Sequence, residues 1–173
     1  MTLSLIKKAF VFSSFFCISS FAYALPADID SANLILKAVR LDSFTTDGNL
    51  KDNWVADKVK VHEGRLDATK ISGWLGKENE KWYISANKGT IPKDGGLIFL
   101  EGDVLIEQKT GNKVLFETQT ASVNTNSMQL HSDDLITIIS QGVVTEAVGI
   151  DIDIKSEQVK LRSKVKTHHE KNN

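Results

Sequence analysis

The chain has 173 residues, which is enough for one domain plus a short leader, and its 25% charged and 8% aromatic residues are ordinary for a folded domain. The formal net charge is -1, so the chain does not have the concentrated positive charge of a nucleic-acid-binding protein. Only two prolines and 11 glycines are present, so the composition predicts no long linker or low-complexity segment. Cys17 is the single cysteine, so no intramolecular disulfide supports the fold.

Residues 1–24 predict an export leader. Lys7 and Lys8 precede an apolar run that is short for a membrane-spanning helix, and Ala22-Tyr23-Ala24 has the small-x-small pattern that signal peptidase cleaves. A cleaved signal peptide and a retained single-pass anchor both stay open. Either one puts the rest of the chain outside the cytoplasm, because the lysines stay on the cytoplasmic side. Residues 25–37 form a lead-in, helical or extended.

The stretch Trp82–Gln108 predicts two strands joined by a turn. Alternate residues are apolar over Trp82–Ala86, and the same period of two returns over Ile98–Ile106. Gly95-Gly96 interrupts the chain between the two runs, which is typical of a turn. Gly102-Asp103 lies inside the second run, where a glycine more often indicates a bulge than the end of a strand.

Similar alternation predicts further strands through residues 38–169, separated by turns rich in glycine, asparagine and aspartate. Asp133-Asp134 is predicted to be a surface turn between two of them. We expect about ten or more short strands with turns every 8–12 residues or so, which is the pattern of an all-β sandwich or barrel. Residues 170–173 are expected to be a disordered tail. The remaining strands are predicted at Ala38–Phe44, Trp54–Val61, Leu66–Leu75, Val114–Val123, Met128–Leu130, Leu135–Ile139, Val143–Ile154 and from Val159 onward.

The last strand has two contrasting faces. Val159 and Leu161 lie on an apolar face, and the opposite face is basic. That basic face is either a solvated surface that discourages random edge pairing, or a surface complementary to anionic groups or to the edge of a partner protein. Its residues are Lys160, Arg162, Lys164 and Lys166.

No catalytic, metal-binding or cofactor-binding group is predicted. The sequence has no G-x-S-x-G elbow and no phosphate-binding glycine loop. His62 and His131 are predicted to lie in turns, and His168-His169 lies in a polar tail, too isolated to indicate a metal site. The sequence therefore favours binding over catalysis.

The apolar residues that alternate in phase must face inward. From the residues alone, they fill an ordinary core. These residues are Trp82, Ile84, Ala86, Ile98, Leu100, Val104, Ile106, Ile150, Ile152, Ile154, Val159 and Leu161.

The order of the segments resembles the LptC family, the periplasmic component of the lipopolysaccharide export system. After the leader come F-x-x-D-G at Phe44, Asp47 and Gly48, then W-Y-I-S-A-N-K-G, L-I-F-L-E-G-D-V-L-I and T-A-S-V-N. S-D-D-L-I-T-I-I, V-G-I-D-I-D-I and K-S-E-Q-V-K-L-R-S-K-V-K-T follow. The resemblance covers about residues 40–169 and lies in the order and spacing of the motifs, since each motif alone is only a strand with a turn.

This resemblance implies an all-β fold, a twisted open β-jellyroll of antiparallel strands like that of LptA, preceded by an apolar leader helix. It implies a non-enzymatic carrier on the periplasmic side of the inner membrane, whose inward residues hold lipid acyl chains. The carrier would accept lipopolysaccharide from the inner-membrane transporter of LptB, LptF and LptG and pass it to LptA. The basic last strand would be the edge that binds the partner protein, and Gly142 and Gly149 would be glycines that matter for function.

Two alternatives stay open. One is the soluble LptA-like bridge protein of the same pathway, which a cleaved leader would fit better. The other is a carbohydrate-binding jellyroll, which requires exposed aromatic side chains on one face. Trp54, Trp74 and Trp82 are the candidates for that face.

Overall fold

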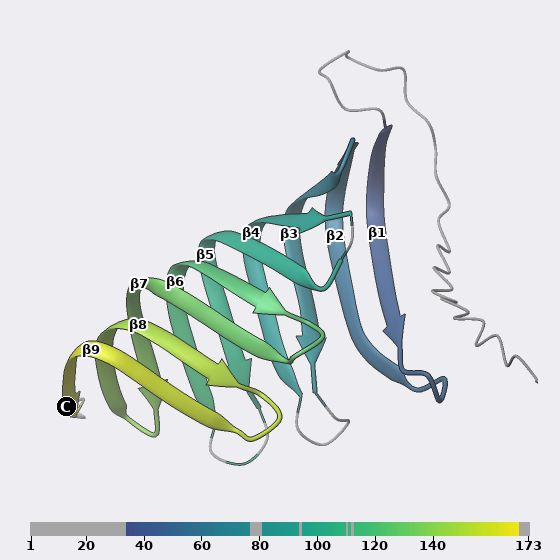
Figure 1. Cartoon of the computed structure of the whole chain (residues 1–173). Helices are drawn as coiled ribbons and strands as arrows, with labels where there is room; N and C mark the ends of the chain where they lie inside the picture. The colour runs from purple at the N-terminus through teal and green to yellow at the C-terminus, as the bar shows by residue number, and fades with distance from the viewer. Residues whose placement is uncertain (1–33, 77–80, 94, 110, 112, 170–173) are drawn as a thin grey trace, which may run out of the picture.

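The computed structural model describes residues 34–76, 81–93, 95–109, 111 and 113–169. The predicted leader (1–24), most of the lead-in (to residue 33) and the tail (170–173) lie outside these residues. The described residues form one sheet of nine antiparallel strands, each hydrogen-bonded to its neighbours in the sequence (Figure 1). The strands are β1 (Leu34–Phe44), β2 (Leu50–His62), β3 (Arg65–Leu75), β4 (Trp82–Pro92), β5 (Leu97–Gln108), β6 (Val114–Asn124), β7 (Gln129–Ser140), β8 (Val143–Asp153) and β9 (Gln158–His169).

The strands are fewer and longer than the sequence predicted. The expected hairpin is confirmed as β4 and β5, but the two predicted strands on either side of Asp133-Asp134 form the single strand β7. The predicted turn there is wrong: the aspartates lie where the pairing of β7 with β8 shifts register, between Ser132 and Leu135. A polar bulge and a turn interrupt apolar alternation in the same way, so the sequence pattern cannot separate them. Within the described residues, no helix is long and apolar enough to cross a bilayer.

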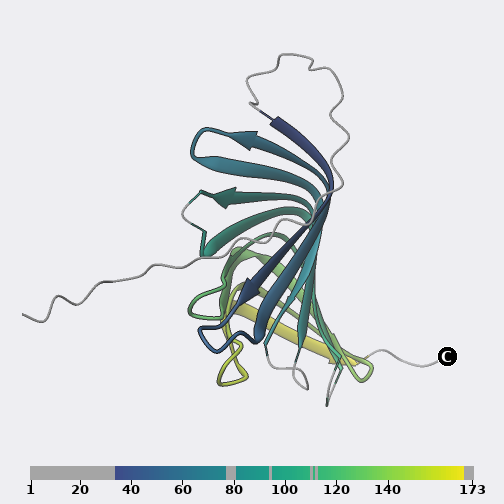
Figure 2. The same cartoon turned by 90° about the vertical axis from the view of Figure 1, so that its right-hand side faces the viewer.

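Backbone irregularities cross the middle of the sheet from strand to strand. Ala38, Lys70 and Asp103 have positive φ angles of 50°, 50° and 46°, and the register shifts between β5 and β6 at Gly102-Asp103, where a bulge was predicted. Bulges bend a strand and increase its twist. Each strand therefore bends near its middle and contributes to both halves of a folded sheet, which we call the two leaves (Figure 2).

The core lies between the two leaves and is built from rows of side chains that cross the strands. In one row, Trp54 of β2 pairs with Gly73, Gly73 with Ile84, Ile84 with Ile106, and Ile106 with Phe116. The four large side chains of this row are each exposed by 3% or less. Burying side chains of this size contributes about 1.5–3 kcal/mol each. The alternation read from the sequence thus becomes a continuous apolar layer.

A charged network on the outer face ties the last three strands together. The Arg162 guanidinium of β9 lies 2.7 Å from Asp133 Oδ1 and donates a hydrogen bond of 2.7 Å to the Ser132 carbonyl. His131 Nδ1 lies 2.6 Å from Asp151 Oδ1 of β8. The hydrogen bond to Asp151 raises the pKa of His131 above its usual value.

We expect Gly73→Ala to destabilise the protein strongly. A Cβ at this position would lie 2.5 Å from the Asn53 carbonyl oxygen and 2.6 Å from the Trp54 ring. Overpacking of this kind costs about 3 kcal/mol at the upper end of its usual range. Gly64→Ala is the matched control, because its φ of 90° imposes strain of about 1 kcal/mol but nothing lies within 4 Å. Urea unfolding midpoints measure both, and equal losses would contradict the packing of Trp54 on Gly73.

We expect His131 to make stability fall as the pH rises through its folded pKa. A histidine whose folded pKa is raised stabilises the protein fully below its unfolded value near 6.5, and that contribution disappears above the folded pKa. The pKa of Asp133 is lowered by its hydrogen bond to Arg162, so that carboxylate stays charged throughout this range. The free energy of unfolding measured between about pH 5 and pH 8 should therefore decline in the wild type. The decline should be weaker in His131→Asn. If the wild type and the variant lose stability equally with rising pH, His131 is not the source of the decline.

Candidate functional site

Most of the residues predicted to line the interior are buried between the leaves. They belong to one contiguous apolar cluster, and ten of the twelve are at most 6% exposed. Their side chains pack into this cluster, so an incoming chain must displace part of that packing. The ten are Trp82, Ile84, Ala86, Ile98, Leu100, Val104, Ile106, Ile150, Ile152 and Ile154.

The other two predicted interior residues lie on the last strand and are not fully covered. Val159 pairs with Ile152 and is 42% exposed, while Leu161 pairs with Ile150 and is half-buried. Residues that pair across strands share a face of the sheet. The inner apolar face therefore continues onto β9, which among the described residues has a neighbouring strand on one side only.

The predicted partner edge, formed by Lys160, Arg162, Lys164 and Lys166, lies on this terminal strand, and all four residues are exposed. They are not equivalent. Arg162 is held by the network of β7 and β8 described above, whereas Lys160 pairs in register with Asp151. The arginine thus stabilises its own sheet, and the lysines are the side chains presented at the edge.

Gly142 and Gly149, the two glycines expected to matter for function, have different structural roles. Gly149 has a φ of 81°, and a Cβ there would lie 2.8 Å from Arg162 Nε, so the glycine leaves room for the arginine to cross β8. Gly142 has a φ of 76° and follows Gln141, whose φ is 51°. Two consecutive positive φ angles form the type I′ turn that joins β7 to β8, and nothing lies within 4 Å of the missing Cβ of Gly142.

A charged residue, Asp52, is also buried near the start of β2, and the sequence analysis did not predict this. Asp52 of β2 is only 2% exposed; the Ser43 hydroxyl donates a 2.8 Å hydrogen bond to its Oδ1. Burial raises the pKa of Asp52. The signal was present, because Asp52 alternates in phase with Trp54 and Ala56 on the inward face of β2.

A side-chain contact joins the rims of the two leaves at the same end. Lys51 Nζ of β2 donates a 3.1 Å hydrogen bond to Asn126 Oδ1 in the turn between β6 and β7, which is not a neighbour of β2 in the sheet. A cavity of about 440 Å³ opens beside this contact; Leu50, Lys51 and Met128 are among the residues that line it. This exposed contact links the rims of the two leaves at this end.

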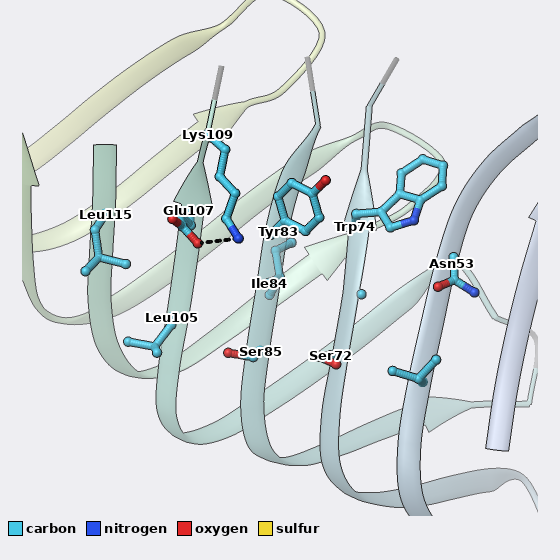
Figure 3. A pocket seen from close by; sticks show the side chains of 12 residues that line it. Asn53, Ser72, Trp74, Tyr83, Ile84, Ser85, Leu105, Glu107, Lys109 and Leu115 are labelled. Atoms are coloured by element: carbon cyan, nitrogen blue, oxygen red, sulfur yellow. Dashed lines mark ion pairs between the residues drawn. The ribbon is translucent and has the colours of Figure 1, made fainter. Parts of the chain in front are cut away.

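A separate hollow of about 330 Å³ lies on the outer face, over β2 to β6 (Figure 3). The Lys109 ammonium lies 4.6 Å from the centre of the Tyr83 ring and 3.2 Å from a Glu107 carboxylate oxygen. Lys81 lies 4.3 Å above the Trp74 ring. Each aromatic ring thus has a cation over one face, a favourable arrangement in itself.

This geometry weakens the carbohydrate-binding alternative. Trp54 is 3% exposed and Trp82 is 1% exposed, so two of its three candidate aromatics are buried in the core. The third, Trp74, is partly covered by Lys81. Among the residues that the structure describes, no three His, Cys, Asp or Glu side chains are arranged to hold a metal ion. The expectation of a protein without catalytic activity stays a prediction.

Comparison with known proteins relates this geometry to a family. Among solved structures, the fold is similar to the crystal structure of LptH from Pseudomonas aeruginosa, described as the LptA-homologous periplasmic component of the lipopolysaccharide transport device. The TM-score is 0.55 at 15% identity, over 69% of this chain and 94% of that one, so the likeness extends to the fold alone. The sequence has no significant match among curated proteins. The family described as "Lipopolysaccharide-assembly, LptC-related" matches residues 9–170, nearly the whole chain, and the protein therefore belongs to the LptC family.

Proposed function

We propose that this protein is a non-enzymatic carrier on the periplasmic side of the inner membrane. It accepts lipopolysaccharide from the inner-membrane transporter of LptB, LptF and LptG and passes it to the bridge protein LptA. Membership of the LptC family supports this function. The observation that carries the proposal is the apolar inner face, which continues from Ile150 and Ile152 onto the open edge strand through Leu161 and Val159.

The interior supplies the binding energy for acyl chains. Each methylene group transferred from water into an apolar interior gains about 0.8 kcal/mol, so a chain of about ten methylenes gains roughly 8 kcal/mol before other costs. Entry must displace buried side chains such as Ile84 and Ile106, which belong to the apolar cluster of the interior. The part of the gain that remains after this separation sets the affinity.

Transfer requires a continuous path between proteins. No strand of the described residues pairs with the outer edge of β9, and a partner strand can add to such an edge by β-augmentation. A partner strand paired with β9 would continue the apolar face beyond Val159 and Leu161, so that acyl chains stay covered during transfer. Lysines at 160, 164 and 166 favour a partner edge of opposite charge over indiscriminate pairing.

At the opposite edge of the sheet, β1 likewise has a single neighbouring strand within the part of the chain that the structure describes. On β1, Leu34 pairs with Val61 and Leu36 with Val59, a core residue, so the inner apolar face also reaches this edge. Leu34 is exposed and Leu36 is half-buried. We assign this edge to the transporter, because it is the end of the domain at which the chain arrives from the leader.

Photoreactive side chains test the lipid path. A photo-crosslinking residue at Ile84 or Leu161 should capture lipopolysaccharide, because both positions share the apolar face. The control is Lys160, adjacent to Leu161 but on the opposite face of β9. Adducts are detected as a gel shift that reacts with an antibody to lipopolysaccharide. Strong labelling at Lys160 together with no labelling at Ile84 would contradict a lipid path through the interior.

A covalent bridge tests whether the leaves must separate. In a Cys17→Ser background, Lys51→Cys and Asn126→Cys are joined by a short, cleavable thiol-reactive linker across the rims. We expect bound lipopolysaccharide to fall roughly tenfold, equivalent to ~1.4 kcal/mol, and to recover when the linker is cleaved. Each single cysteine variant treated with the same reagent is the control. Unchanged loading of the bridged protein would mean that lipid enters elsewhere or does not need the leaves to open.

A further inference from the structure

Charged side chains are divided unevenly among the strands of the sheet. Strands β5, β6, β7 and β8, which lie side by side, contain many acidic residues and no lysine or arginine. Negative charge therefore dominates these strands, and a field of one sign attracts ligands of the opposite sign. The acidic residues are Glu101, Asp103, Glu107, Glu117, Asp133, Asp134, Glu146, Asp151 and Asp153.

The centre of this acidic region lacks cations of its own. The basic residues of β9 pair in register with the acidic residues of β8 and balance them. By contrast, Glu117 of β6 forms no ion pair with any residue that the structure describes. Asp103 of β5 accepts a 2.8 Å hydrogen bond from Asn87, and Asp134 of β7 accepts one of 2.6 Å from Thr120. Both of these donors are uncharged, so the negative charge at the centre is not neutralised.

Two leucines lie exposed among these carboxylates. Leu105 of β5 is 40% exposed, and Leu135 of β7 is 59% exposed, more than any other large apolar side chain of the described residues. Each is followed in its strand by a buried residue, so both leucines point to the outer face of the sheet. They line one hollow of about 370 Å³ together with Asp103 and Glu117. Leu105 also lines the neighbouring outer hollow (Figure 3).

The spacing and the backbone of these strands favour a helix as the bound element. Leu105 pairs with Glu117, Glu117 pairs with Thr137, and Leu135 lies two residues before Thr137, so the leucines are about 12 Å apart. Helix residues seven positions apart share a face at about 10 Å. Because β5, β6 and β7 each have neighbouring strands on both sides, an extended partner has no sheet edge to join here. A helix satisfies its own backbone hydrogen bonds.

The carboxylates decide the charge of the partner. An anionic bilayer surface is repelled by unneutralised negative charge. An uncharged apolar partner that covers the leucines would also bury carboxylates without a cation, which costs free energy. A helix with lysines or arginines between its apolar residues avoids both penalties, since those cations lie next to Glu117 when the apolar residues contact Leu105 and Leu135.

We propose that the acidic patch, formed by Asp103, Leu105, Glu117, Asp134 and Leu135, binds a basic amphipathic helix of a partner protein. The leucines anchor the apolar face of the helix, and the carboxylates pair with its cations. The patch lies on the outer face of inner strands of the sheet, away from the edge strands β1 and β9. This interaction therefore goes beyond the proposed carrier function and leaves the lipid path free.

A labelled peptide tests the patch on the full chain. The probe is a helical peptide of lysine and leucine with leucines seven residues apart on one face, and fluorescence anisotropy measures its Kd. We expect Leu135→Ser to weaken binding roughly tenfold, because it removes an apolar anchor. Glu117→Gln should weaken binding about threefold, because it removes one exposed charge pair. Phe44→Ser, which removes a side chain of similar exposure from β1, is the control and should bind the peptide as the wild type does.

A second peptide and a lipid surface supply the outcomes that would overturn the proposal. The same peptide with glutamate in place of lysine should not bind. Equal binding of the two peptides, or wild-type affinity in both Leu135→Ser and Glu117→Gln, overturns the acidic patch. Vesicles of phosphatidylethanolamine and phosphatidylglycerol that bind the wild type but not Leu135→Ser would assign the patch to a bilayer and overturn it as well. Lipopolysaccharide capture at Leu161 should persist in Leu135→Ser; its loss would place Leu135 in the lipid path, contrary to the proposal.

Discussion

The bend that each strand makes near its middle is the constraint on which the rest of this structure depends. A flat sheet with one apolar face would leave that face in water, and within the described residues no helix or second sheet is present to cover it. The bulges near Ala38, Lys70 and Asp103 fold the sheet, so that each leaf covers the apolar face of the other. One sheet thereby supplies both walls of the core.

A folded single sheet keeps its edges, and here the edges and the interior belong to one surface. The row that contains Ile150 in the core reaches Leu161 on β9, and the row that contains Val59 reaches Leu36 on β1. A protein that buried all of its apolar surface would end these rows before the edge strands. Because these rows reach both edge strands of the described sheet, the apolar surface that stabilises the core is the same surface that we propose as the path for apolar ligands.

The local parts of this architecture could be predicted from the sequence, and the long-range parts could not. The hairpin of β4 and β5 was predictable because alternation and turn glycines are properties of neighbouring residues. The identity of β7 as one strand was hidden, since Asp133 and Asp134 interrupt the alternation as a turn would. Arg162 looked like one of four equivalent basic residues, and only the approach of β7 across β8 makes it a structural residue.

The residues of the candidate site likewise divide into those that the sequence could predict and those that it could not. Ten interior residues were found by alternation, whereas Asp52 and Trp54 were missed because a charged residue and an indole do not by themselves indicate an inward face. Their burial follows from the row in which they lie, and whether their polar atoms find partners depends on side chains from other strands. Unsatisfied polar groups in a core are detectable only in three dimensions.

An interior that closes on itself when empty has a consequence for a carrier. Displacing side chains of the buried apolar cluster forfeits contacts among them, so the net gain for an acyl chain is smaller than its transfer from water alone would give. That reduction makes release possible without a chemical step. It does not by itself give the lipid a direction, because apolar contacts are non-directional.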